Sequence, residues 1–88
     1  MDEIEGWRNR IDEIDTQVLE LLNERARCAM AIGKIKMAKG LKIYSPDREK
    51  AVLERIKERN KGPLEYSAVE RIFERIIEES RRIEITAV

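Results

Sequence analysis

The stretch LELLNERARCAMAIGKIK, residues 19–36, begins as an amphipathic helix and then breaks its own pattern. Apolar residues of such a helix recur every three or four positions, and Arg25 stands where this spacing requires another Leu or Ile. A permanent cation in an apolar row either fixes the register of associating helices or faces a site that holds an anion. This stretch alone leaves both interpretations open.

The apolar row continues in both directions, over roughly residues 3–38. Its spacings alternate three and four, and all but one of its positions are apolar: Ile4, Trp7, Ile11, Ile14, Val18, Leu21, Arg25, Cys28, Ile32 and Ile35. The pattern predicts one long helix with a heptad seam. Asp2 is a suitable N-cap and Gly40 a suitable C-terminal stop. Gly33, inside this helix, indicates close packing or access for a ligand.

Two shorter helices complete the predicted chain. One is expected over roughly residues 46–60, with Ser45 as its N-cap, because the following Pro suits the first helical position. The other is expected over residues 65–84, after a Gly-Pro break. Strand patterns are missing. We therefore predict an all-α fold with three helices that form a single domain over residues 1–88.

The length of the first helix predicts an assembly. About 35 residues of helix span about 50 Å, whereas a compact domain of this size has a radius of gyration of about 12 Å. Two short helices cannot cover so long a rod. We predict an intertwined homodimer in which two-fold association buries the same seam of both chains, and a monomer that is not stable alone.

Composition excludes several classes of function. The chain has 18 Lys and Arg and 18 Asp and Glu, so it lacks the positive charge of a nucleic-acid-binding protein. One Cys and no His rule out an internal disulfide and remove the usual ligands of zinc. No apolar run has the length of a membrane span. We expect a cytoplasmic protein with no metal, no cofactor, no nucleic-acid partner and no membrane association.

Polar residues interrupt or border the apolar rows of all three predicted helices. Each has an ordinary explanation on its own, such as a surface ion pair, a snorkelling lysine or a serine bonded to its own helix. Together they place cations beside apolar walls, which is typical of a pocket for a small polyanion. The residues concerned are Arg8, Arg25, Lys36, Arg48, Glu49, Ser80 and Glu84.

The chain also lacks the usual parts of hydrolytic and group-transfer enzymes. It has no His, no nucleophile with an adjacent base and no Gly-rich phosphate loop. A reaction that needs only shape and fixed charge remains compatible with it.

Three segments resemble the all-helical chorismate mutase family: RNRIDEIDTQVLELLNERARCAMAIGKIK (8–36), DREKAVLERI (47–56) and RIFERIIEES (71–80). The R-x-x-I-D-x-I-D opening, L-L-x-E-R followed by G-K-x-K, and D-R-E are jointly specific. The resemblance implies an intertwined homodimer with two active sites, each built from both chains. It also implies that the substrate is chorismate and the product prephenate, on the route to phenylalanine and tyrosine.

The implied reaction is a unimolecular rearrangement in which one C–O bond breaks as one C–C bond forms. A catalyst can hold the substrate dianion in a compact, reactive shape and stabilise the negative charge that grows on the ether oxygen. By resemblance, Arg25 and Arg8 of the partner subunit would each bind a carboxylate, with Arg48 assisting. Lys36 would donate to the ether oxygen and a carboxylate.

The resemblance assigns the remaining polar residues to the substrate's other groups. Glu49 would bind the substrate hydroxyl and Ser80 the ring carboxylate. Glu84 stands where bacterial members often carry Gln, and a carboxyl group donates to the ether oxygen only when protonated, so we expect the greatest activity at acidic pH. Ser45 stands where some members have an Asp that helps to bind substrate, and can be helix cap, ligand or both.

The sequence leaves two other functions open. An isochorismate-pyruvate lyase on the same scaffold would handle a similar dicarboxylate by a related pericyclic step. A non-catalytic dimerisation module would explain the heptads, with Arg25 as a register device, but not the polar residues beside the other apolar rows.

Overall fold

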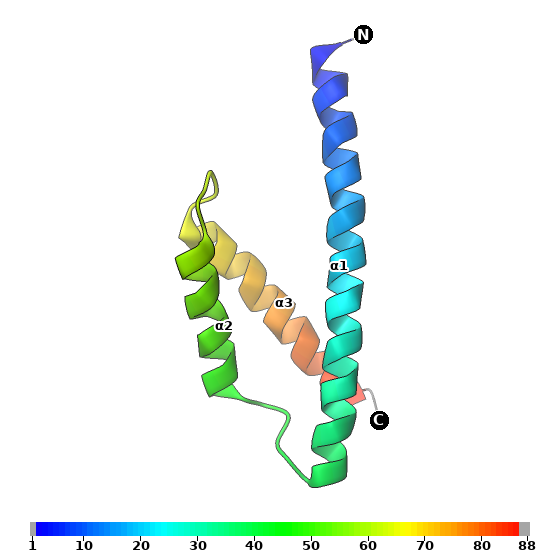
Figure 1. Ribbon diagram of the computed structural model, residues 1–88, viewed down its shortest axis with the longest axis vertical. Helices are drawn as coiled ribbons and strands as arrows, with labels where there is room; N and C mark the ends of the chain where they lie inside the picture. The colour runs from blue at the N-terminus through cyan, green and yellow to red at the C-terminus, as the bar shows by residue number, and fades with distance from the viewer. Residues whose placement is uncertain (1, 87–88) are drawn as a thin grey trace.

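The computed structural model describes residues 2–86, which form three helices joined by two short connections (Figure 1). The helices are α1 (Glu3–Lys39), α2 (Pro46–Arg59) and α3 (Tyr66–Thr86). The described residues contain no strand. The predicted all-α chain of three helices is confirmed, and each helix end lies within two residues of its expected position.

The capping residues predicted for α1, Asp2 and Gly40, are in place at its two ends. The Asp2 side chain accepts a hydrogen bond from the backbone N–H of Ile4 at 2.9 Å. Gly40 adopts a left-handed conformation, with φ 66°, in which the N–H of Leu41 reaches the carbonyl of Lys36 at 2.8 Å. Ser45 is the N-cap residue of α2, as predicted, but its side chain makes no capping hydrogen bond.

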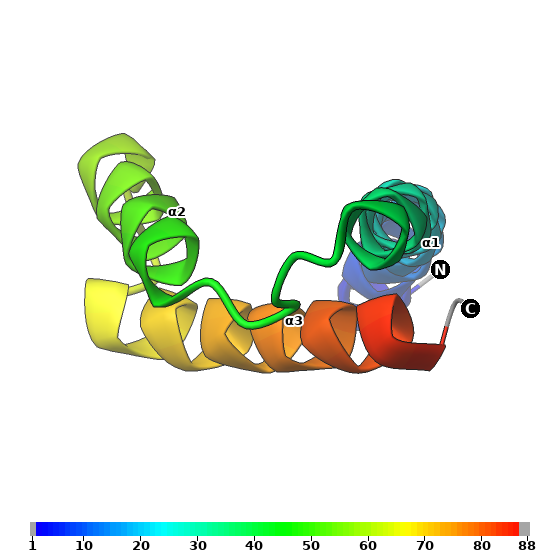
Figure 2. The same cartoon turned by 90° about the horizontal axis from the view of Figure 1, so that it is seen from below.

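Helix α3 bridges the other two helices. Figure 2 shows it running beneath both, from α2 at one end to the C-terminal part of α1 at the other, and it packs against each of them. The result is an elongated body of 57 × 26 × 15 Å with a radius of gyration of 16.3 Å, well above the value of about 12 Å for a compact domain of this length.

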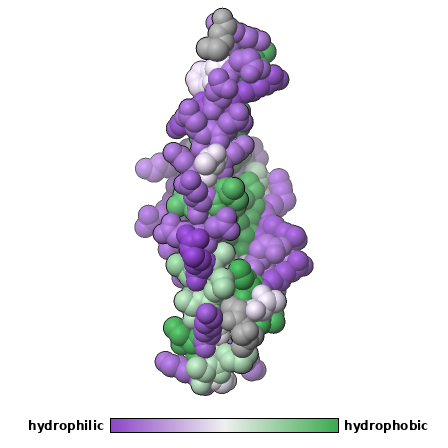
Figure 3. Space-filling model, turned by 90° about the vertical axis from the view of Figure 1, so that its right-hand side faces the viewer, coloured by the Kyte–Doolittle hydropathy of each residue, from purple (hydrophilic) through white to green (hydrophobic). Residues whose placement is uncertain are grey.

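The N-terminal half of α1 extends beyond the other helices (Figure 1), and the apolar side chains of its seam are exposed. The exposed fraction is 72% for Trp7 and 64% for Leu21. Hydrophobic side chains are also visible along the middle and lower part of the face in Figure 3. Among the described residues only four are buried, and none is aromatic: Ala29, Gly33, Val52 and Ile77. So small a core leaves most of the apolar surface in contact with water.

Close packing, rather than ligand access alone, explains the glycine inside α1. A Cβ atom on Gly33 would lie 2.6 Å from the backbone oxygen and 2.8 Å from the Cα of Glu84 in α3. These are backbone atoms, so no side-chain rotation can relieve the contact. The closest approach of α1 and α3 is therefore at Gly33, where α1 has no side chain.

We predict that Gly33→Ala destabilises the protein, although alanine favours a helix by up to about 1 kcal/mol over glycine. Pushing α3 away from α1 should lower the free energy of unfolding by about 1–3 kcal/mol, measured by chemical denaturation. Gly6→Ala is the matched control, because a Cβ there meets nothing within 4 Å. An unchanged or raised stability of Gly33→Ala would contradict the close crossing.

Candidate functional site

A pocket of about 450 Å³ is lined by residues of all three helices and of the connection between α1 and α2. Apolar side chains from each helix form part of its wall, and charged side chains face the same space. Its lining comprises Arg25, Cys28, Ala29, Ile32, Lys36, Ile43, Ser45, Arg48, Glu49, Val52, Arg55, Ile77, Ser80, Arg81 and Glu84. Seven of the eight residues expected in a site are therefore brought together by a single chain.

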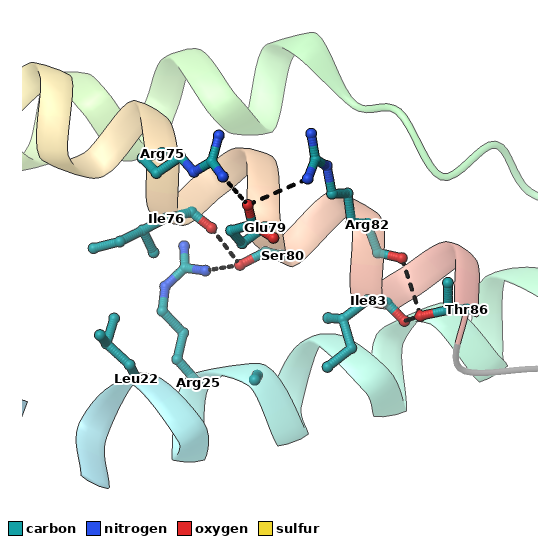
Figure 4. Close-up of a pocket in the computed structure, with 10 residues that line it drawn as sticks. Leu22, Arg25, Arg75, Ile76, Glu79, Ser80, Arg82, Ile83 and Thr86 are labelled. Carbon is teal, nitrogen blue, oxygen red and sulfur yellow. Dashed lines mark hydrogen bonds and ion pairs between the residues drawn. The ribbon is translucent and has the colours of Figure 1, made fainter. Parts of the chain in front are cut away.

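The residue that breaks the seam points across to α3. Arg25 donates a hydrogen bond to the Ser80 hydroxyl, which itself donates to the carbonyl of Ile76 at 2.9 Å (Figure 4). The hydrogen bond from Ser80 to its own helix, which alone would explain a serine in an apolar row, is present. Ser80 also accepts the hydrogen bond from Arg25. Both residues also border a second hollow of about 510 Å³ between α1 and α3, so this contact lies between the two spaces.

Lys36 and Glu84 form a pair at the crossing of α1 and α3. Their Nζ and Oε1 atoms are 3.3 Å apart, and the side chains are 20% and 12% exposed. Lys36 also donates to the carbonyl of Ile43 at 2.9 Å. The Lys36 ammonium group thus contacts both the segment between α1 and α2 and the Glu84 carboxylate of α3. Both contacts lie at the same end of the pocket.

Glu49, at the start of α2, is held by an arginine of α3. Arg81 Nε lies 3.0 Å from Glu49 Oε2, and Arg81 Nη2 lies 2.9 Å from Oε1, which is a two-point contact between planar groups. The guanidinium carbon of Arg81 is also 5.0 Å from the centre of the Tyr44 ring, within the range of a cation–π interaction. The hydrogen bonds to Glu49 raise the pKa of Arg81 above its ordinary value.

Positive charge dominates the pocket. Arg25, Arg48 and Arg55 line it, and none of the three has an acidic partner within 4.0 Å among residues 2–86. Burial, followed by repulsion from the Arg48 and Arg55 guanidiniums, lowers the pKa of Arg25 below its ordinary value. Guanidinium groups nevertheless stay protonated at neutral pH. A bound anion would relieve this repulsion, so the charge distribution favours a polyanionic ligand.

Arg8 lies outside the pocket of its own chain. It pairs with Glu5 at 3.0 Å, and its side chain is 67% exposed. The 17 residues that separate it from Arg25 correspond to about 25 Å along α1. Within one chain this residue therefore cannot reach a ligand that Arg25 binds.

Two pocket arginines were missed from the sequence, although each carried a signal. Arg55 lies seven residues after Arg48, two turns along the helix face that also carries the buried Val52. Arg81 lies four residues after the buried Ile77, within a charged ESRRIE run that has the composition of a solvated surface. Neither residue interrupts an apolar row, and both lie among other charged residues, which is the pattern of a solvated helix face.

The described residues contain no group of three or more His, Cys, Asp or Glu side chains that could hold a metal ion. No helix in the part of the chain that the structure describes is long and apolar enough to cross a membrane.

The pocket offers fixed cations, hydrogen-bond donors and apolar walls. Such an arrangement can bind a small anion in one shape and stabilise negative charge that develops on it.

Known proteins share both the sequence pattern and the fold. A family model described as Chorismate mutase type II matches residues 7–85. The bifunctional chorismate mutase/prephenate dehydratase of Neisseria gonorrhoeae is 48% identical over 77 residues, 88% of this chain and 21% of that protein. The chorismate mutase of Methanocaldococcus jannaschii is 35% identical over 81 residues, 88% of this chain and 79% of that protein. The chain thus spans about a fifth of the bifunctional relatives it matches.

Solved structures agree with these matches. Form II of the chorismate mutase from Thermus thermophilus superposes with a TM-score of 0.93 at 30% identity, covering 94% of each chain. Chorismate mutase from Helicobacter pylori in complex with prephenate gives a TM-score of 0.87 at 28% identity, covering 96% of this chain and 91% of that one. The chain belongs to the type II chorismate mutase family.

Proposed function

We propose that this protein is a chorismate mutase, an isomerase that rearranges chorismate to prephenate in the biosynthesis of phenylalanine and tyrosine. The observation that carries the proposal is the pocket itself, in which Arg25, Arg48 and Arg55 carry no acidic partner in the described chain and face a space of about 450 Å³. The family membership and the prephenate bound to the Helicobacter pylori neighbour support it.

The proposed catalysis is electrostatic and conformational. Arg25 and Arg48 bind carboxylates of the substrate and hold it in a compact, reactive shape, which lowers the entropic part of the barrier. Lys36 stabilises the negative charge that grows on the ether oxygen as the C–O bond lengthens. No proton transfer and no covalent intermediate are needed, so a pocket without a nucleophile–base pair suffices.

The polar residues on the other two helices select the remaining groups of the substrate. On substrate binding the Ser80 hydroxyl turns from the Ile76 carbonyl to donate its one hydrogen to the ring carboxylate. Glu49 accepts a hydrogen bond from the ring hydroxyl. Glu84 in its protonated form donates to the ether oxygen beside Lys36. Ser45 lines the pocket, and its side chain makes no capping hydrogen bond to α2, which leaves its hydroxyl available to a ligand.

We also propose that the active unit is an intertwined homodimer in which Arg8 of the partner subunit completes each pocket. The uncovered row of α1 from Ile4 to Leu21 supplies the apolar surface for such an interface. Arg8 lies on this same extended half of the helix, remote from its own Arg25. Antiparallel association of two α1 helices would carry it toward the other chain's pocket.

The direct test is incubation of the protein with chorismate, with loss of chorismate absorbance as the rate and identification of prephenate as the product. Isochorismate is assayed in parallel, because release of pyruvate from it, with chorismate left unchanged, would mean a lyase instead. A folded dimer that is inert toward both substrates would mean a non-catalytic dimerisation module.

Arg25→Met is expected to lower kcat/KM by about a hundredfold or more, because it removes a charged contact to the dianion. The same change should leave the melting temperature equal or higher, since a partly buried cation without an acidic partner is replaced by an apolar side chain. Arg27→Met is the matched control, because Arg27 is exposed on α1 and does not line the pocket. A loss of assembly with kinetics unchanged per folded dimer would instead identify Arg25 as a register device.

Glu84 is expected to make turnover depend on pH. Only the protonated carboxyl donates a hydrogen bond, so kcat should be high at acidic pH and fall as the pH rises and the carboxyl ionises. Lys36 Nζ lies 3.3 Å from Glu84 Oε1, so the same end of the pocket carries both groups proposed to contact the ether oxygen. Glu84→Gln donates at every pH and should flatten the profile. Superimposable profiles for the two proteins would remove Glu84 as the donor.

The shared pocket is tested by mixing two inactive variants, Arg8→Ala and Arg25→Ala, which are unfolded and refolded together. If each pocket combines Arg25 of one chain with Arg8 of the other, each mixed dimer contains one intact pocket. Random pairing at equal amounts then restores about a quarter of the wild-type activity per chain. Refolding each variant alone is the control, and a mixture with no recovered activity would place both residues in the pocket of the same chain.

A further inference from the structure

Glu49 does not face the pocket as an independent carboxylate. Both of its oxygens are bound by Arg81, at 3.0 Å and 2.9 Å, and its side chain is 25% exposed. The two residues belong to different helices, α2 and α3, and both line the pocket. No other ion pair in the described chain joins α2 to another helix.

We propose that Arg81 is a positioning residue, which fixes the Glu49 carboxylate and neutralises its charge so that a dianionic substrate can bind beside it. The inference rests on the proposed function, in which Glu49 accepts a hydrogen bond from the substrate hydroxyl.

Orientation is the first part of this role. A glutamate side chain has three rotatable bonds, and ordering it on substrate binding carries an entropic cost. Two parallel hydrogen bonds from one guanidinium fix both the position and the plane of the carboxylate. Each oxygen has a second lone pair, so Glu49 can still accept a hydrogen bond from the substrate while it is held.

Neutralising the charge of Glu49 is the second part of the role of Arg81. The substrate carries two negative charges, and an uncompensated carboxylate in the same pocket would repel it. Both Glu49 oxygens lie within 3.0 Å of Arg81 nitrogens, whereas Lys36 lies beside Glu84. Arg81 therefore compensates Glu49 locally, and the charges of Arg25 and Arg48 remain available to the substrate.

Arg81 also contacts the segment that leads into α2. The Tyr44 ring lies 5.0 Å from its guanidinium carbon, and the neighbouring Ile43 carbonyl accepts the hydrogen bond from Lys36. The connection between α1 and α2 is thus held from α1 by Lys36 and from α3 by Arg81. Within α2 the hydrogen bonds of Arg81 go to Glu49 alone, so loss of Arg81 would first release this carboxylate.

The test is a kinetic double-mutant cycle on the full-length protein with chorismate as substrate. Arg81→Met should lower kcat/KM at least about tenfold, mainly through KM, because a hydroxyl contact is made in both the ground state and the transition state. Arg81→Lys keeps the charge without the planar fork and should fall between Arg81→Met and wild type. In a Glu49→Gln background, Arg81→Met should cost no more than about threefold, since its effect acts through Glu49.

Arg82→Met is the matched control. This neighbour also forms ion pairs, with Glu78 at 3.0 Å and Glu79 at 3.5 Å, but does not line the pocket, so kcat/KM should stay within about twofold of wild type. A wild-type protein that does not convert chorismate overturns the proposed function and this inference with it. An active wild type in which Arg81→Met is harmless, or equally harmful with and without Glu49, overturns the inference alone.

Discussion

The close crossing of α1 and α3 at Gly33 is the constraint on which the pocket depends. The backbone of Glu84 lies where a side chain of residue 33 would be, so the two helices meet with almost nothing between them. Lys36 lies one turn beyond the crossing on α1, and Glu84 lies at it on α3, which explains why these two groups form a pair. Toward the other end of α3 the helices diverge, and the space between them contains Arg25 and Ser80.

The same geometry explains how a chain with no net charge concentrates positive charge at one place. The acidic side chains of the pocket, Glu49 and Glu84, are each held by one cation. The other pocket guanidiniums, Arg25, Arg48 and Arg55, have no such partners among residues 2–86. The lowered pKa of Arg25 reflects its burial first and then repulsion from the other two. Elsewhere, as between Arg75 and Glu79 on α3, opposite charges pair along exposed helix surfaces, where they contribute little to stability.

Much of the fold could be predicted because its signals are local. The apolar row with alternating spacings of three and four, the cap at Asp2 and the left-handed Gly40 define α1 from residues that are neighbours in sequence. The anomaly at Arg25 indicated the pocket for the same reason, since a cation in an otherwise apolar row can be recognised without knowing what lies opposite.

The contacts between helices could not be predicted in this way. Nothing near Arg81 in the sequence reveals that it binds Glu49, 32 residues earlier, because that contact depends on how α3 crosses α2. The sequence likewise does not decide whether Gly33 serves close packing or ligand access, because the answer depends on where Glu84 of α3 lies. Pairwise contacts of this kind depend on tertiary geometry, whereas periodicity reports only which face of a helix is apolar.

The bare apolar row of α1 affects how such a protein tolerates genetic change. In the proposed dimer each residue of that row occurs twice across one two-fold axis, so a single codon alters two contacts at once. A substitution that weakens each contact by about 1 kcal/mol would shift the dimerisation constant by roughly thirtyfold. The long helix should therefore accept fewer neutral replacements than the solvated faces of α2 and α3, even at positions remote from the pocket.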